Sequence, residues 1–302
     1  MIAPKISPNS RRLRMARSGI DKIRPASTAD GGPGPGTAGE LVFAIGDIHG
    51  RYDLLKALLL TITQDYPTRA DGRRPMLIFC GDYIDRGPQS AAVLEALIWL
   101  QRHAHLQVRL LKGNHEQALL TFLDDPDAGR GWLEFGCLAT LAAYGVEAPR
   151  PDAGIVDLFR ARDDLLARLP ASHLRLLDSL ELMVVVGDYA FVHAGIRPSK
   201  PLAAQETRDL LGIREAFTDA PGPYEKIIVH GHSWRGDTAE VLGHRVGLDT
   251  GAYATGVLSA VRLDGPEVVI LTARDPQAGP WNPWAIPPSD QATRQGPPPG
   301  SK

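Results

Sequence analysis

Short apolar runs alternate with longer amphipathic stretches through the middle of the chain. Each run holds four or five residues, a length typical of buried strands rather than helices. Strands are expected at 41–45, 76–80, 108–112, 182–186, 189–193, 226–230 and 268–271. Helices are expected at 53–64, 90–103, 116–124, 155–168 and 203–217. This alternation indicates an α/β fold, and the later strands, which lack intervening helices, indicate a mixed sheet with a more antiparallel second half.

The two ends of the chain lack this pattern. Residues 1–39 are rich in arginine and contain the run GGPGPG, so we expect a disordered basic extension. Residues 276–302 hold many prolines and are expected to form a flexible tail, in which Trp281 and Trp284 either dock on a partner or pack on the chain's own domain. Residues 40–275 are then expected to form one domain.

Composition narrows the class of protein. The 302 residues are 43% hydrophobic and 23% charged, with a formal net charge of -2. Nothing global therefore points to nucleic acid or an anionic membrane as a partner, and no run is long and apolar enough to span a bilayer. Neither Cys80 nor Cys137 belongs to a C-x-x-C pair, which excludes a disulfide framework and favours the cytoplasm.

Five of the expected strands end abruptly in glycine and polar residues. The segments that follow or close these strands are GDIHG (46–50), GDYIDRG (81–87), GNHE (113–116), HAG (193–195) and HGHS (230–233). In open α/β sheets ligands bind at the carboxyl ends of the strands. Aspartate, asparagine and histidine gathered there are what a metal site needs, and the glycines let the backbone approach a bound ion or phosphate.

These segments, in this order, resemble the calcineurin-like metallophosphoesterases and, more closely, the phosphoprotein phosphatase family with its bacterial serine/threonine phosphatases. The resemblance covers roughly residues 41–275. A single short match arises readily by chance, whereas five in order do not. The resemblance implies two mixed β-sheets packed as a sandwich, flanked by helices, with a dinuclear metal site at the carboxyl ends of the strands.

The resemblance also implies a set of metal ligands. Asp47 and His49 match ligands of the first metal, and Asp82 matches the carboxylate that bridges both metals. The residues that match ligands of the second metal are Asn114, His193 and His232. Two divalent ions are expected, with manganese favoured and iron or zinc possible for these donors. Such a pair activates a bridging hydroxide that attacks phosphorus directly.

Four further residues match catalytic positions of the family. Arg86 matches a phosphate-binding arginine, and Arg214 resembles a second one, although a surface salt bridge is an alternative for Arg214. His115 matches the general acid for the leaving oxygen, and Asp85 would orient its imidazole. Asp249 and Tyr253 lie in a further segment that looks familial.

Other residues near these motifs have simpler interpretations. His230 competes with His232 for one ligand role, and the GH-Ser pattern favours His232. Glu116 is expected to open a helix, where an acidic residue suits the helix dipole. No organic cofactor is expected.

The function implied is hydrolysis of phosphomonoesters, first of all phosphoserine or phosphothreonine in proteins. The alternative is symmetrical hydrolysis of diadenosine tetraphosphate by an enzyme of the same superfamily, in which glutamine tends to replace His49 and aspartate Glu116. Phosphorylated small molecules therefore remain possible substrates. A non-catalytic binding protein on the same fold is disfavoured, because the expected ligands and catalytic residues are all present.

Overall fold

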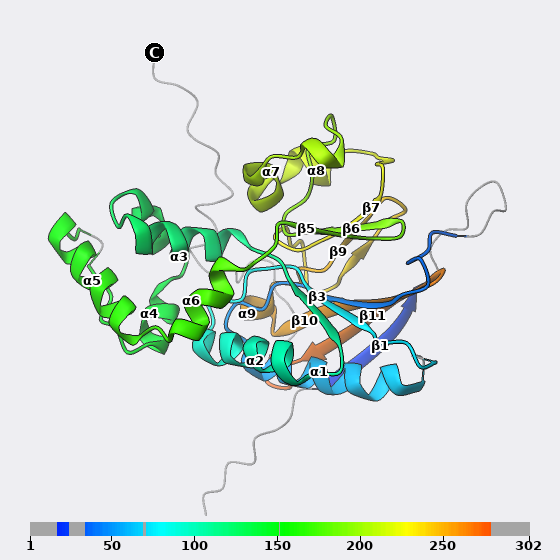
Figure 1. The fold of residues 1–302 in the computed structure, drawn as a ribbon, viewed down its shortest axis with the longest axis horizontal. Helices are drawn as coiled ribbons and strands as arrows, with labels where there is room; N and C mark the ends of the chain where they lie inside the picture. Colours follow the sequence, from blue (N-terminus) through cyan, green and yellow to red (C-terminus); the bar gives the residue numbers. More distant parts are fainter. Residues whose placement is uncertain (1–16, 24–33, 69–70, 151, 279–302) are drawn as a thin grey trace, which may run out of the picture.

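The computed structural model describes residues 17–23, 34–68, 71–150 and 152–278. They form two β-sheets that pack on each other, with helices on the outer faces and at one end (Figure 1). The six-stranded sheet has the order β1 (Arg17–Ile23), β11 (Glu267–Arg274), β10 (Val257–Asp264), β2 (Leu41–Ile45), β3 (Met76–Phe79), β4 (Gln107–Leu110). The five-stranded sheet has the order β5 (Met183–Val186), β6 (Tyr189–Val192), β7 (Ile227–His230), β9 (Arg245–Gly247), β8 (Glu240–Val241).

Both sheets are mixed, as expected. In the larger sheet β2, β3 and β4 run parallel, while β10 pairs antiparallel with β2 and with β11. In the smaller sheet β6, β7 and β9 run parallel, and the outer strands β5 and β8 pair antiparallel with β6 and β9. The parallel strands of each sheet carry the polar segments at their carboxyl ends, so the arrangement gathers those segments at one edge of the two sheets.

The alternating side chains of β2 show how the layers are built. Leu41, Phe43 and Ile45 belong to a core cluster shared with the flanking helices, and Val42 and Ala44 belong to the cluster between the two sheets. Successive side chains of a strand point to opposite faces. A strand buried on both faces is therefore apolar throughout, which is why 41–45 was recognisable as a continuous run.

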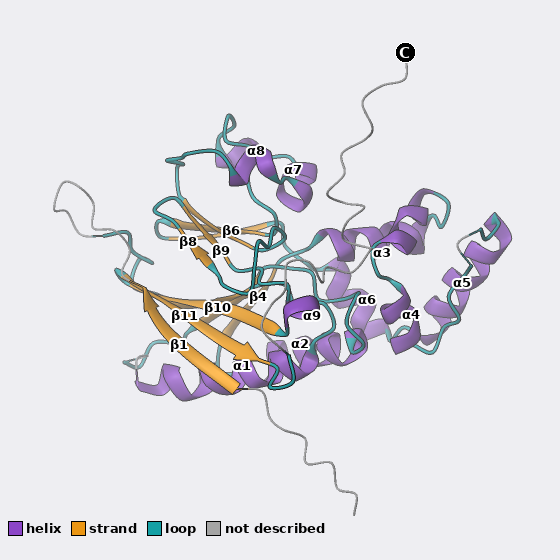
Figure 2. Cartoon of the chain, turned by 180° about the vertical axis from the view of Figure 1, so that it is seen from behind, coloured by secondary structure: helices purple, strands orange, loops and turns teal. Residues whose placement is uncertain are grey.

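The helices lie in three groups (Figures 1 and 2). Against the outer face of the larger sheet lie α1 (Tyr52–Asp65) and α2 (Ser90–His103). A helical lobe beside this layer contains α3 (Asn114–Asp124), the 3-10 helix η2 (Ala128–Glu134), α4 (Leu138–Ala143), α5 (Ile155–Arg168) and α6 (Ala171–Asp178). The outer face of the smaller sheet is covered by α7 (Thr207–Gly212) and α8 (Glu215–Thr218). The short helix α9 (Ala252–Thr255) leads into β10, and two 3-10 turns, η1 (Tyr66–Thr68) and η3 (Leu202–Ala204), complete the elements.

Some expectations about the elements need correction. The prediction that residues 1–39 lack structure is wrong for Arg17–Ile23, which form β1 and pair with β11 over seven residues. Backbone hydrogen bonds hold an edge strand to its neighbour. Such a strand can therefore form without a regular alternation of apolar side chains in its sequence. The expected helix 203–217 is interrupted, because Ile213 and Arg214 between α7 and α8 leave the helical conformation.

Other segments escaped prediction or lie outside the description. β8, β9 and β10 were not predicted. Of these, β10 has eight residues, as many as β11, and it pairs with both β2 and β11. Of the expected proline-rich tail, residues 279–302, with Trp281 and Trp284, lie outside the described residues. Among the helices that the structure describes, none combines the length and apolarity needed to cross a membrane.

Candidate metal centre and active site

The residues predicted as ligands come together at the carboxyl ends of the central strands. Each is placed by the loop or helix that follows one strand. Asp47 and His49 follow β2, Asp82 follows β3, Asn114 and His115 open α3 after β4, His193 follows β6, and His232 follows β7. The site thus draws on both sheets, which explains why Asp47 and His232, 185 positions apart in the chain, are in contact.

Asp82 lies at the centre of this cluster. Its Oδ2 is 3.5 Å from Nε2 of His49, and its Oδ1 is 3.5 Å from Nε2 of His193. Asp82 belongs to two groups that could each hold a metal ion, one with His49 and His115 and the other with His193 and His232. Burial opposes ionisation, yet the imidazoles of His193, His115 and His49 hold the pKa of Asp82 well below its usual range. A carboxylate shared by two adjacent groups is the arrangement that a bridged metal pair requires.

Two of the histidines are oriented by backbone carbonyls. Nδ1 of His49 lies 2.9 Å from the carbonyl oxygen of Ile84, and Nδ1 of His193 lies 2.8 Å from that of Cys80. In each ring Nδ1 carries the proton for this hydrogen bond, which leaves Nε2 as the unprotonated nitrogen that faces Asp82. The Nε2 of His193 also lies 2.9 Å from Oδ1 of Asn114. Neutral imidazole nitrogens and an amide oxygen are therefore directed at the same centre.

Two buried atoms of the cluster indicate that a cation belongs there. Oδ1 of Asp47 and Nε2 of His232 have no hydrogen-bond partner among the described residues. Burial, and then the neighbouring carboxylates of Asp249 and Asp82, raise the pKa of Asp47. Buried polar groups without partners cost free energy, and clustered carboxylates repel one another. A divalent metal ion would relieve both costs, so the residues present fit the group.

Glu116 shapes the loop that carries Asp82. Its carboxylate accepts the backbone N–H groups of Asp82 and Gly113 at 2.9 Å and that of Tyr83 at 2.8 Å. Asp82 itself adopts a left-handed backbone conformation with φ of 51°, which costs free energy for a residue with a side chain. Burial, and then Asp82, raise the pKa of Glu116 to about 7. Glu116 lies in the first turn of α3, as predicted, but its contacts give it a larger structural role than capping.

Two motif glycines are required by close packing against the ligands. A Cβ atom on Gly113 would lie 2.1 Å from Oδ1 of Asp82, and one on Gly231 would lie 1.8 Å from Oδ1 of Asp47. Any side chain at either position would displace the carboxylate. The glycines in GNHE and HGHS are thus explained by the space that the ligand oxygens occupy.

His115 and Asp85 form a buried pair beside the cluster. Nδ1 of His115 lies 2.7 Å from Oδ2 of Asp85. Burial lowers the pKa of His115, but the charges of Asp82 and Asp85 outweigh it and raise that pKa above its ordinary value. The carboxylate of Asp85 also accepts the indole N–H of Trp132 at 2.8 Å and the hydroxyl of Thr140 at 2.6 Å. The imidazole is therefore held in one orientation, with Nε2 toward the cluster.

The two predicted arginines differ in their surroundings. Arg86 is half-buried, and its Nη2 lies 3.4 Å from Nε2 of His115. Its Nη1 donates a hydrogen bond to the hydroxyl of Tyr253, and the guanidinium lies 4.6 Å from the centroid of that ring. Arg214 is exposed, between α7 and α8. Burial is the main reason that the pKa of His193 is lowered, and the charge of Arg214 adds to this effect.

Several residues of the site were missed or undervalued by sequence reasoning. Trp132 and Thr140 come from η2 and α4 of the helical lobe, and no motif marks them. Tyr253, singled out only as part of a familial segment, contacts Arg86. Asp249, from the same segment, is buried near Asp47, and burial raises its pKa to about 7. The familial segment at 248–253 was the signal that drew attention to Asp249 and Tyr253.

The fold and this cluster define a metallophosphoesterase. The profile of the calcineurin-like phosphoesterase family matches residues 41–256, and the chain belongs to that family. Its members use divalent metal ions to hydrolyse phosphoesters, so the chain is a metal-dependent hydrolase. The family match covers every residue of the cluster described above.

Several relatives of this chain are nucleotide hydrolases. An asymmetrical bis(5'-nucleosyl)-tetraphosphatase of Anoxybacillus flavithermus is 27% identical over 252 residues, which are 77% of this chain and 94% of that protein. A symmetrical bis(5'-nucleosyl)-tetraphosphatase of Acidovorax ebreus is 32% identical over 177 residues, which are 58% of this chain and 50% of that protein. A solved structure of a candidate diadenosine tetraphosphatase superposes with a TM-score of 0.51 at 19% identity, over 80% of this chain and 96% of that one, and shows the shared fold.

Proposed function

We propose that the chain hydrolyses dinucleoside polyphosphates of the bis(5'-nucleosyl) tetraphosphate class. The observation that carries this proposal is the similarity to a bis(5'-nucleosyl)-tetraphosphatase along almost the whole length of that relative. The same substrate class was the alternative expected from the sequence. Because relatives of both the asymmetrical and the symmetrical type are similar to this chain, the bond that is cleaved is left to the experiment below.

The preference for a phosphoprotein substrate rested on His49, on Glu116 and on the IREAF segment (213–217). His49 is buried, with its Nε2 directed at Asp82, and Glu116 is buried against backbone N–H groups. Neither side chain is placed to touch the part of a substrate that distinguishes a nucleotide from a phosphopeptide. The two residues therefore give no reason to prefer a protein over a nucleotide, and the relatives favour the nucleotide.

The proposed metal ligands share Asp82 with the two groups described above, and add Asp47 and Asn114 from the motifs. In this proposal Asp47, His49 and Asp82 hold one ion, and Asp82 is shared with a second ion. The second ion is held also by Asn114, His193 and His232. When bound, two divalent ions, for which manganese is our first choice, polarise the phosphoryl group and lower the pKa of coordinated water.

The remaining side chains act on the substrate directly. His115, with its pKa raised and its Nδ1 hydrogen-bonded to Asp85, holds a proton on Nε2 that can pass to the departing oxygen. Arg86 presents a guanidinium beside that nitrogen and is proposed to bind phosphate oxygens, with Arg214 as a second contact. The proton neutralises the charge that develops on the leaving group, and the arginines neutralise the charge that develops on the phosphoryl group.

The test is a side-by-side assay of the manganese-loaded protein. One arm offers diadenosine tetraphosphate, the other a phosphoserine/phosphothreonine peptide, each with a chelator control, and kcat/KM is compared. We expect the dinucleotide to be preferred. Chromatography of the products then identifies the bond that is cleaved. Symmetrical cleavage gives two ADP, and asymmetrical cleavage gives ATP and AMP. Preference for the peptide would overturn the proposed substrate and leave the family assignment intact.

The cytoplasmic location expected from the sequence stays a prediction.

A further inference from the structure

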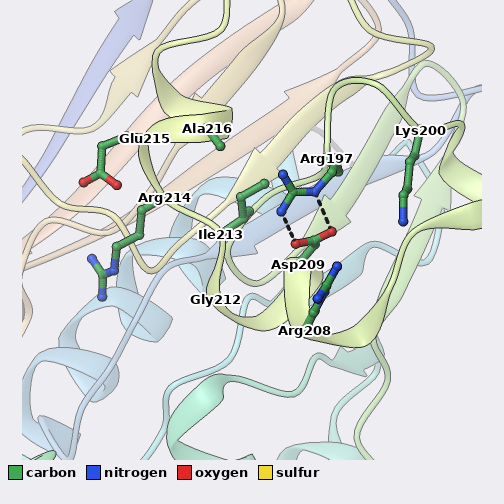
Figure 3. A pocket seen from close by; sticks show the side chains of 9 residues that line it. All are labelled: Arg197, Lys200, Arg208, Asp209, Gly212, Ile213, Arg214, Glu215 and Ala216. Atoms are coloured by element: carbon green, nitrogen blue, oxygen red, sulfur yellow. Dashed lines mark hydrogen bonds and ion pairs between the residues drawn. The ribbon is translucent and has the colours of Figure 1, made fainter. Parts of the chain in front are cut away.

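A basic pocket lies beside the metal centre, on the outer side of the smaller sheet. Its volume is about 670 Å³, which is within the range of sites for small organic ligands. Four basic and two acidic side chains line it: Arg197, Lys200, Arg208, Arg214, Asp209 and Glu215 (Figure 3). Arg214 lies at one end and Lys200 at the other, with the pair of Arg197 and Asp209 between them. We refer to this site as the basic pocket.

The basic pocket is joined to the metal centre by a short stretch of chain. The loop after β6 begins with His193, a proposed ligand, and reaches Arg197 four residues later, so their Cα atoms are at most about 14 Å apart. The backbone N–H of Ala194 donates to the carbonyl of Leu210 in α7 at 2.8 Å. A Cβ atom on Gly195 would lie 2.2 Å from the ring of Phe217 in α8. The wall of the pocket and the ligand loop are therefore tightly packed together.

The charges in the pocket are of two kinds. Arg197 is fixed, because its Nε and Nη2 both donate to the carboxylate of buried Asp209. Lys200 and Arg208 instead share one exposed acid, Glu206, outside the pocket lining. Exposed ion pairs of this sort contribute little to stability. A phosphate group can therefore replace Glu206 as the partner of Lys200 and Arg208 at small cost.

Arg214 links the pocket to the reacting phosphate. It lines the pocket, and its guanidinium makes no hydrogen bond or ion pair with the described residues, while its backbone carbonyl accepts the N–H groups of Phe217 and Thr218. Its backbone is held away from the helical conformation, with φ of -128° and ψ of -112°, by the break between α7 and α8. The break thus projects a cation from the boundary between the pocket and the metal centre.

We propose that the basic pocket binds the phosphates of the substrate that are not attacked, and so selects substrates with a polyphosphate chain. The proposal rests on the proposed function and deepens it. A dinucleoside polyphosphate carries anionic oxygens on both sides of the attacked phosphorus, whereas a phosphoserine side chain carries a single phosphate. Cations placed beyond the metal centre are of use only to the first kind of substrate.

The test compares a pocket variant with a matched control. Lys200→Gln with Arg208→Gln removes two pocket cations and leaves the fixed Arg197–Asp209 pair intact. Arg150→Gln with Arg160→Gln removes two exposed arginines of the helical lobe, whose side chains are 83% and 69% exposed. Each protein is assayed with diadenosine tetraphosphate and with p-nitrophenyl phosphate, and circular dichroism checks that all three fold.

For the pocket variant we expect KM for the tetraphosphate to rise about 5- to 20-fold with kcat little changed, since charged contacts that bind ground and transition state alike are lost. kcat/KM for p-nitrophenyl phosphate should change less than about 2-fold. The control variant should match the parent on both substrates. Equal effects of the pocket variant on both substrates, or none on the tetraphosphate, would overturn the proposal.

A second measurement separates this proposal from the proposed function. Inhibition of p-nitrophenyl phosphate hydrolysis is measured with inorganic tripolyphosphate and with orthophosphate, in excess metal so that chelation affects all proteins equally. The basic pocket predicts that tripolyphosphate inhibits the parent more strongly than orthophosphate and that the pocket variant loses this difference. If the parent does not cleave the tetraphosphate, the proposed function fails, and the inhibition still decides whether the pocket binds polyphosphate. Equal loss of inhibition by both anions, or loss by neither, contradicts the pocket.

Discussion

Trp132 donates its indole N–H to Oδ2 of Asp85 at 2.8 Å, and the same oxygen lies 2.7 Å from Nδ1 of His115. The helical lobe therefore contributes buried side chains to the catalytic edge of the sheets. Thr140 completes the support by donating to Oδ1 of Asp85. With both oxygens occupied, the carboxylate cannot rotate, and the direction of the imidazole is set by a residue that has no contact with substrate.

Replacing Trp132 with Phe tests this support. The aromatic volume stays, while the hydrogen bond to Asp85 is lost, and a hydrogen bond to a charged group contributes about 1.5–3 kcal/mol. We expect kcat on an alkyl phosphomonoester, whose leaving oxygen needs a proton, to fall about 10-fold, as the imidazole loses its fixed direction. Trp99→Phe is the control, because Trp99 is 56% exposed on α2. Unchanged kcat in Trp132→Phe, at unchanged metal content, would show that Trp132 serves packing alone.

Replacing His115 with Asn tests the proton donor. Turnover should fall by about 100-fold or more on alkyl phosphomonoesters such as a phosphoserine peptide, whose basic leaving oxygen must be protonated, in keeping with the usual size of general acid catalysis. The loss should be smaller on p-nitrophenyl phosphate and on diadenosine tetraphosphate, whose leaving oxygens need little protonation. His115 also belongs to one of the groups that could hold a metal, so metal content is measured in parallel. Loss of one metal ion from the variant would reassign His115 as a ligand.

Replacing Asp82 with Asn tests the shared carboxylate. The amide keeps the size of the side chain but removes the negative charge that would serve both metal ions. We expect activity to be lost and the metal content, measured by elemental analysis, to fall from two ions towards one or none. A fully active variant that retains two ions would contradict the bridging role.

Replacing Arg86 with Ala tests phosphate binding. Arg86 lies next to His115 and contacts Tyr253, so its loss removes a cation at the edge of the cluster. Inhibition by orthophosphate should weaken about 10-fold, and kcat/KM should fall by at least as much. Tyr253→Phe keeps the guanidinium and removes only its hydrogen-bond partner, so its effect should be much smaller. Orthophosphate inhibition that does not change in Arg86→Ala would place this arginine outside the phosphate site.

Much of the candidate site was visible in the sequence because its residues sit in short loops directly after buried strands. The strand at 41–45 is apolar on both faces, and the polar residues that follow it, Asp47 and His49, have only a few residues in which to turn. The direction of the strand then places their side chains at one edge of the sheet. The close approach of Gly113 to Asp82, by contrast, joins the loops that follow two neighbouring strands, β3 and β4.

The residues that could not be foreseen act across long distances in the chain. Trp132 and Thr140 reach Asp85 from a lobe whose apolar pattern predicts helices but not where they pack. β1 joins the larger sheet through backbone hydrogen bonds, which leave little trace in a side-chain pattern. The substrate class could not be read from His49 and Glu116, because both side chains are buried in the metal centre and its supporting loops. It depends on residues that reach the substrate from other parts of the chain.

The sequence by itself determined the order of the strands with their polar ends, and with them the metal-binding chemistry of the chain, because strand period and turn residues act over a few positions. Only the tertiary structure decided which faces of the two sheets pack against each other and that Arg197, Lys200 and Arg214 line a pocket next to the metal centre. Both features depend on which apolar faces are buried against each other. The pattern of apolar and polar residues within one segment does not determine that packing.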